Sequence, residues 1–196
     1  MSLFSMTLTF FLILDSVGHI ADFNDFLQNV SKRRQRFILF REMAFALGLL
    51  VLFHYFGVYL INGLQVSPGT IRISGGLVLF LIAIKMVFPT ETRPYKTPVG
   101  EPFIVPMAIP MIAGPSILAV VMFYASTETR SYEVLSAILL AWLASVSLLW
   151  VCWEFRHKIN LKVLSALERL MGLLLTMLAV EMFLKGLRIF LWKQSL

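Results

Sequence analysis

Long apolar segments separated by short polar segments make up almost the whole chain of 196 residues. No charged residue occurs in residues 43–71, 102–127 or 134–153, and a helix needs only about 20 apolar residues to cross a bilayer. The pattern predicts six apolar spans, at residues 2–27, 41–61, 68–88, 103–125, 133–153 and 163–190. We therefore expect an all-α membrane protein with six transmembrane helices.

The first and fourth of these spans are interrupted halfway by residues that do not continue a regular helix. The first contains Asp15 and Gly18, and the fourth contains Pro110, Gly114 and Pro115. Proline removes a backbone donor, and a carboxylate in hydrocarbon is unfavourable unless it faces protein or water. A matched pair of interrupted spans is typical of a transport site near the middle of the bilayer.

The two halves of the chain match when the sequence is shifted by 96 residues. Five ungapped matches follow this offset: Gly18 with Gly114, Gly76 with Gly172, Leu79 with Leu175, Ala83 with Ala179, and Met86 with Met182. The two glycine pairs carry the argument, because leucine and alanine match often by chance in such a sequence. Because each half holds three spans, the halves must cross the membrane in opposite directions. The sequence thus predicts two inverted three-helix repeats, residues 1–88 and 103–196, joined by a linker at 89–102.

The distribution of lysine and arginine predicts the orientation of the spans. Twelve of the 17 basic residues lie on the side of the membrane that holds the linker, so this side should be cytoplasmic and both termini should face outward. The composition agrees, since 59% of the residues are hydrophobic and only 14% are charged. The net charge of +6 lies in loops beside the bilayer, so we expect the lipid bilayer, and no nucleic acid, as a partner.

The first interruption offers Asp15, Gly18 and His19 as candidate binding residues. Asp15 lies about 18 Å into its span at the α-helical rise, and Gly18 would let a ligand approach the backbone. These residues could hold a coupling ion or proton and contact a substrate. The alternative is a short first span, in which Asp15 and His19 are solvated at the cytoplasmic interface.

The second interruption offers Pro110, Ala113, Gly114 and Ser116. Pro110 frees a carbonyl one turn upstream, and freed carbonyls in hydrocarbon must be satisfied by protein, water, ion or substrate. A new half-helix beginning near Gly114 would present open amide donors to a carboxylate. The alternative is a packing kink, which is the commoner role of an isolated proline in a transmembrane helix.

Other polar residues in the spans favour structural roles, except Arg72, for which a structural and a functional role weigh equally. The long stem of Arg72 could carry its guanidinium to the outer interface, and Glu181 and Lys185 are spaced to neutralise each other on one helix. His54 lies in an aromatic run, which favours a hydrogen-bonded packing role. No zinc signature, nucleophile elbow or phosphate-binding loop is present in the sequence, so we expect neither a metal site nor an enzyme.

Taken together, these motifs resemble the MarC family of six-span bacterial and archaeal membrane proteins. The Asp-Pro-x-Gly-Asn pattern of that family stands here as residues 15–19, with Ser16 and His19 in place of the proline and the asparagine. Its Arg-Ile-x-Gly-Gly pattern stands at residues 72–76. Its Pro-x-Ala-Ile-Pro-x-x-Ala-Gly-Pro-Gly pattern stands at residues 106–116, with Ser116 in place of the last glycine.

The resemblance implies a secondary transporter of small polar metabolites, and of small neutral amino acids in particular, in the bacterial inner membrane. The substrate carboxylate would meet the amides near Gly114 and Ser116, and the ammonium or a coupling proton or sodium ion would meet Asp15. No cofactor is expected, and a homo-oligomer is possible. The alternative function is a non-transporting membrane factor that acts on lipids or protein partners, and a membrane enzyme ranks third.

Overall fold

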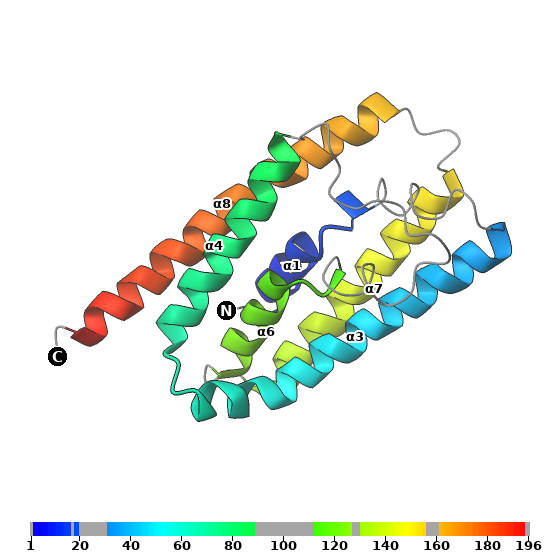
Figure 1. Ribbon diagram of the computed structural model, residues 1–196. Coiled ribbons are helices and arrows are strands. Elements are labelled where there is room, and N and C mark those ends of the chain that lie inside the picture. Colours follow the sequence, from blue (N-terminus) through cyan, green and yellow to red (C-terminus); the bar gives the residue numbers. More distant parts are fainter. Residues whose placement is uncertain are drawn as a thin grey trace.

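The computed structural model describes residues 2–16, 18–19, 31–88, 112–126, 130–155 and 161–194, and these residues form helices joined by turns (Figure 1). The helices are α1 (Leu3–Leu14), α3 (Lys32–Gly63), α4 (Pro68–Val87), α6 (Pro115–Ser126), α7 (Ser131–Phe155) and α8 (Leu161–Gln194). Within these ranges there is no strand, so the predicted all-α class is confirmed.

Four of the helices are long and apolar enough to cross a membrane. Their candidate spans are Arg33–Gly63, Pro68–Val87, Ser131–Glu154 and Ser165–Leu191, which correspond to the predicted second, third, fifth and sixth spans. The remaining two helices, α1 and α6, have 12 residues each and lie within the predicted first and fourth spans. Parts of those two spans fall outside the described residues, so six complete crossings stay a prediction.

Local sequence signals account for the ends of these helices. Ser2 and Ser67 precede α1 and α4, and their side chains accept hydrogen bonds from the amides of Ser5 and Thr70. Pro68 occupies the first turn of α4, where a missing amide donor has no consequence. Helix α3 begins at Lys32, well before the predicted 41, because hydropathy marks the edge of the hydrocarbon and not the end of a helix.

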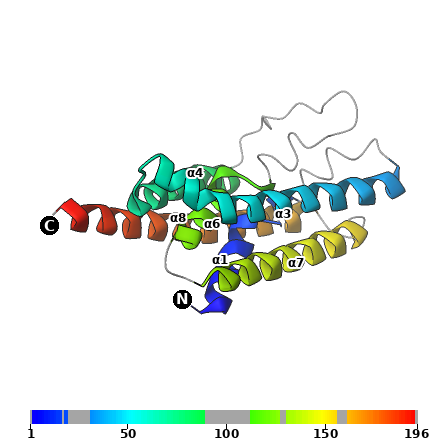
Figure 2. The ribbon, with the colours of Figure 1, turned by 90° about the horizontal axis from the view of Figure 1, so that it is seen from below.

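The two short helices lie between two pairs of long helices (Figure 1). Helix α6 packs against α3 and α4, whereas α1 packs mainly against α7. From below, α1 runs from its N-terminus at the edge of the molecule toward the middle (Figure 2). Seven residues of α6 are buried: Ser116, Ile117, Ala119, Val120, Val121, Phe123 and Tyr124. The two short helices beside the interruptions therefore contribute to a core that the long helices share.

The α3–α7 pair is antiparallel and is joined by polar contacts along its length. The indole of Trp142 donates to the carbonyl of Met43 at 2.8 Å, and Nε2 of His54 lies 2.9 Å from Oγ of Ser131. His54 is only 3% exposed, which agrees with its predicted packing role. Near the other end of the two helices, Arg36 of α3 and Glu154 of α7 form an ion pair on the surface.

Glycines bring the backbones of α4 and α8 into close contact. A Cβ atom added to Gly76 would lie 2.9 Å from the carbonyl oxygen of Ala179, and one added to Gly172 would lie 3.1 Å from that of Ala83. A third close approach joins Gly69 and Gly186, so the two helices run antiparallel. Small residues of this kind let transmembrane helices approach closely enough for extensive van der Waals contact.

The α4–α8 contacts obey the 96-residue relation between the halves. Shifting Gly76 by 96 residues gives Gly172, and shifting Ala83 gives Ala179. Applying the 96-residue offset to both partners converts the contact of Gly76 with Ala179 into the contact of Gly172 with Ala83, and the structure contains both contacts. A local two-fold axis between the antiparallel helices would exchange the two contacts in the same way. Superposition of the complete halves stays a prediction, because parts of both lie outside the described residues.

We expect Gly76→Val to lower the free energy of unfolding by about 1–3 kcal/mol, because the added side chain would overlap the backbone of α8. The measurement is chemical or thermal unfolding in detergent. The matched control is Gly48→Ala in α3, where an added Cβ meets nothing within 4 Å. This control should leave stability unchanged or raise it by about 1 kcal/mol at most, since alanine favours a helix over glycine. Equal stability of the two variants would contradict the packing role of Gly76.

Candidate functional site

The predicted interruption of the first span is present at Asp15. Helix α1 ends at Leu14, and Asp15 adopts the left-handed conformation, with φ 43° and ψ 48°. Its amide still donates to the carbonyl of Leu12 at 3.1 Å. Aspartate tolerates this conformation better than most residues, because its short side chain can form local hydrogen bonds. The interruption is therefore encoded locally by Asp15.

The carboxylate of Asp15 organises the turn that follows. Its Oδ1 atom accepts a hydrogen bond from the amide of Gly18 at 3.3 Å. The backbone carbonyl oxygen of Asp15 accepts a second hydrogen bond, from the amide of His19. A Cβ atom on Gly18 would collide with the other carboxylate oxygen and would lie 3.1 Å from the side chain of Met86. Gly18 thus allows the carboxylate to fold back onto the chain. Asp15 and His19 are half-buried, and Gly18 is buried.

The second interruption is visible from Ile112 onward. Ala113 and Gly114 are buried and lie outside any regular helix, and α6 begins at Pro115. The carbonyl of Gly114 accepts the amide of Leu118 at 3.2 Å, which starts the first turn of α6. Ser116 is 4% exposed. The predicted half-helix start is therefore confirmed, whereas Pro110 lies outside the described residues.

The two interruptions belong to helices that touch each other. The rings of Phe10 in α1 and Tyr124 in α6 meet edge to face with centroids 5.6 Å apart. This contact shows that the two short helices share one core. The meeting of the interruptions themselves at mid-depth, and their role in binding, stay predictions.

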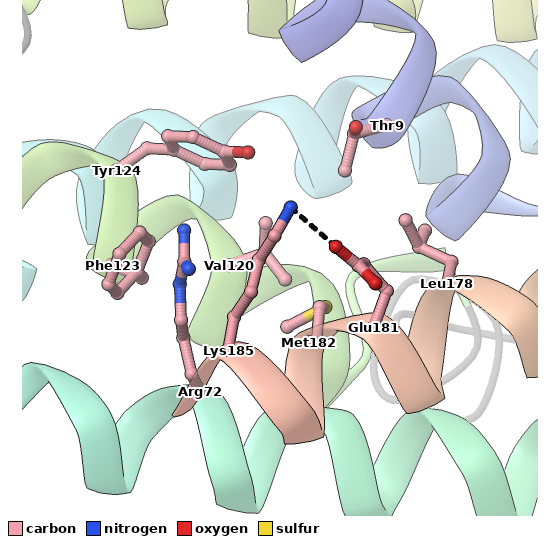
Figure 3. Close-up of a pocket in the computed structure, with 9 residues that line it drawn as sticks. All are labelled: Thr9, Arg72, Val120, Phe123, Tyr124, Leu178, Glu181, Met182 and Lys185. Carbon is pink, nitrogen blue, oxygen red and sulfur yellow. Dashed lines mark ion pairs between the residues drawn. The ribbon is translucent and has the colours of Figure 1, made fainter. Parts of the chain in front are cut away.

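A small cavity of about 60 Å³ opens between α1, α4, α6 and α8 (Figure 3). Its polar and aromatic lining consists of Thr9, Arg72, Phe123, Tyr124, Glu181 and Lys185, and three apolar side chains complete the wall. None of the binding residues that were predicted from the sequence lines this cavity. Along α6 its lining residues lie five to nine residues beyond Pro115, which is about 8 to 14 Å at the α-helical rise.

The charges around the cavity fall into two groups. Glu181 and Lys185 form the predicted pair on α8, with 2.8 Å between carboxylate and ammonium. Arg72 lies instead against the aromatic wall, with its guanidinium carbon 3.7 Å from the centre of the Phe123 ring. In this position Arg72 is half-buried. Among the described residues, no hydrogen bond or ion pair engages its guanidinium.

Sequence reasoning missed Thr9 and Tyr124 as cavity residues. Neither belongs to a recognisable local pattern, and only the packing of α1 and α6 against α4 and α8 brings them together. Arg72 could have been found, because it begins the Arg-Ile-x-Gly-Gly motif and is the one charged residue between 43 and 84.

Sequence comparison places the chain among membrane proteins. The family described as MarC family integral membrane protein matches residues 1–191. The UPF0056 inner membrane protein YhgN of Escherichia coli strain K12 is 40% identical over 183 residues, which cover 92% of this chain and 93% of that protein. A UPF0056 membrane protein of Buchnera aphidicola is 39% identical over 189 residues, covering 94% and 95% of the two chains.

A more distant UPF0056 membrane protein, from Chlamydia pneumoniae, is 35% identical over 191 residues. These residues cover 95% of this chain and 94% of that protein. No solved structure matches the chain. The similarity to these relatives thus extends over nearly the full length, and the family match at residues 1–191 includes both interruptions.

Proposed function

Because the chain belongs to the MarC family of integral membrane proteins, we propose that it is a secondary transporter of small polar metabolites, and of small neutral amino acids in particular. The membrane would be the bacterial inner membrane, to which the name of the E. coli relative assigns that protein. The substrate would cross without chemical change, driven by a proton or sodium gradient. Both termini would face outward, in keeping with the distribution of basic residues.

One observation carries this proposal: both interrupted segments place helix ends inside the protein. The turn at Asp15 and Ser16 ends α1, and the buried stretch at Ala113 and Gly114 precedes α6. Irregular backbone at membrane depth is tolerated only where it is buried in protein or lines a water-filled cavity. Paired half-helix ends supply the amide donors and carbonyl acceptors that bind zwitterions and ions in transporters.

The α4–α8 contacts support an inverted repeat as the framework. Their two-fold relation follows the 96-residue offset that also relates Gly18 to Gly114. In an inverted repeat, the outer face of one half corresponds to the inner face of the other. Such a protein can therefore form an outward-open and an inward-open state from equivalent packings.

The test is uptake of labelled glycine and alanine by proteoliposomes that contain the purified protein. We expect accumulation above the external concentration when a proton or sodium gradient is imposed, and its loss when an ionophore collapses that gradient. Protein-free liposomes provide the background. If the folded protein moves none of the small neutral amino acids under either gradient, the transporter proposal is wrong, and a non-transporting membrane factor becomes the better description.

A further inference from the structure

We propose that the cavity between α1, α4, α6 and α8 is an outer binding site for a small zwitterion, in which Arg72 binds the carboxylate. The choice of an amino acid as the zwitterion rests on the proposed function. The site differs from the two interruptions, since Asp15, Gly18, Gly114 and their neighbours do not line the cavity. A substrate would therefore meet Arg72 before it reaches the middle of the protein.

Arg72 is placed to bind an oxyanion. Its guanidinium carbon lies over the Phe123 ring, 3.7 Å from the ring centre. An aromatic ring takes up no conventional hydrogen bond in such a cation–π contact, so the N–H donors are left for a ligand. Arginine binds carboxylates through two parallel hydrogen bonds, and such charge-assisted pairs are stronger than neutral ones. Figure 3 shows the guanidinium directed into the cavity, below the Tyr124 ring.

Glu181 provides the complementary charge. Its carboxylate contacts Lys185 at 2.8 Å through one oxygen, and a carboxylate has about four lone-pair positions. An ammonium group of the ligand can thus bind Glu181 without displacing Lys185. Arg72 approaches from α4 and Glu181 from α8, on different walls of the cavity (Figure 3). This arrangement suits a ligand that carries both charges.

The mouth of the cavity faces water. Glu181 and Lys185 are 56% and 51% exposed, yet they lie within the apolar segment Ser165–Leu191. An ammonium and a carboxylate in contact with lipid tails would be costly, and such groups normally face protein or an aqueous cavity. Arg72 lies in the second turn of α4, and Tyr124 lies near the end of α6. Both positions are at the predicted outer face.

The volume limits the ligand to a very small molecule. A water molecule occupies about 10–15 Å³ when the volume is that open to the centre of a water-sized sphere. Measured in this way the cavity has about 60 Å³, which is room for roughly four to six water-sized groups. Glycine has five non-hydrogen atoms and fits this space. Aromatic and long-chain amino acids do not fit unless the walls move.

The first experiment measures labelled glycine uptake by proteoliposomes that carry the parent, Arg72→Gln, Arg72→Lys or the control Arg130→Gln. Arg130 is a matched control, because it lies near the same end of α6 but is 72% exposed and pairs with Glu133 outside the cavity. We expect Arg72→Gln to raise KM at least about tenfold, as loss of a charge-assisted hydrogen bond predicts. The maximal rate should change little, Arg72→Lys should be intermediate, and Arg130→Gln should equal the parent.

The second experiment tests the location without relying on turnover. In a Cys152→Ala background, Thr9→Cys places a thiol in the cavity wall, and a membrane-impermeant thiol reagent is added from outside. Glycine should slow the labelling of this thiol, and Arg72→Gln should remove the protection. Glycinamide, which has no carboxylate, should protect less than glycine does.

The outcomes separate this inference from the transport proposal. Normal glycine KM in Arg72→Gln, or labelling that glycine does not slow, would overturn the outer site even if the parent transports. Glycine protection without uptake would support the site and contradict transport. If Arg72→Gln changes only the phospholipid that copurifies, the oxyanion partner is a lipid phosphate, and the proposed substrate site is wrong.

Discussion

Asp15→Asn should abolish gradient-driven accumulation of glycine while leaving the protein folded. Asparagine keeps a side-chain oxygen that can accept the Gly18 amide, so the turn after α1 can persist. Asparagine also tolerates the left-handed conformation that residue 15 adopts. The substitution removes the negative charge, which is the feature that would bind a coupling cation. The measurement is accumulation in proteoliposomes under an imposed proton or sodium gradient.

Two controls define the meaning of this result. Glycine should still protect Thr9→Cys from labelling in the Asp15→Asn protein, because the outer cavity does not include Asp15. Exchange of labelled for unlabelled glycine without a gradient shows whether the pathway itself survives. If accumulation remains sensitive to the gradient in Asp15→Asn, the carboxylate has only the structural task of capping the turn.

Gly114→Leu should also eliminate glycine uptake, whereas Ser116→Ala should reduce it only mildly. Gly114 is buried directly before α6, so a leucine side chain would fill the space in which a carboxylate could approach the first amides of that helix. Ser116→Ala removes one neutral hydroxyl, whose hydrogen bond would contribute about 0.5–1.5 kcal/mol to the binding free energy of the substrate. Its KM for glycine should therefore rise by no more than roughly tenfold. Both variants are compared in the proteoliposome assay.

The folding of the leucine variant needs its own check. Unfolding in detergent measures its stability, and glycine protection of Thr9→Cys reports whether the outer cavity is intact. A folded Gly114→Leu protein that transports at the parental rate would show that substrate does not pass this turn. Gly114→Ala then serves as a smaller change at the same position, with an intermediate expected rate.

Local signals in the sequence were sufficient for much of the fold. Pro68 after Ser67 marked the start of α4, and the structure begins the helix at that residue. Asp15 and Pro115 marked the two interruptions, because the backbone preferences of aspartate and proline act within a turn or two. Helix α3 was predicted too short, since the basic residues from Lys32 onward continue the helix beyond the apolar segment.

The cavity could not be predicted in the same way. Its walls come from four helices, and the stacking of Arg72 on Phe123 depends on the angle at which α6 crosses α4. One feature of this crossing can be seen in the sequence, namely Gly75 in α4. A Cβ atom added to Gly75 would lie 2.9 Å from the Cβ atom of Ala119 in α6. That glycine permits the close crossing, but its identity alone does not reveal which side chains meet one turn away.

The close approaches between α4 and α8 also constrain how the protein can move. They recur every seven residues, at Gly69, Gly76 and Ala83 on α4, opposite Gly186, Ala179 and Gly172 on α8. Sliding one helix past the other by a single turn would press bulky side chains such as Leu79 and Phe80 against backbone. Interfaces packed in this way do not deform gradually. Under the proposed transport function, α4 and α8 should therefore move together as one rigid body.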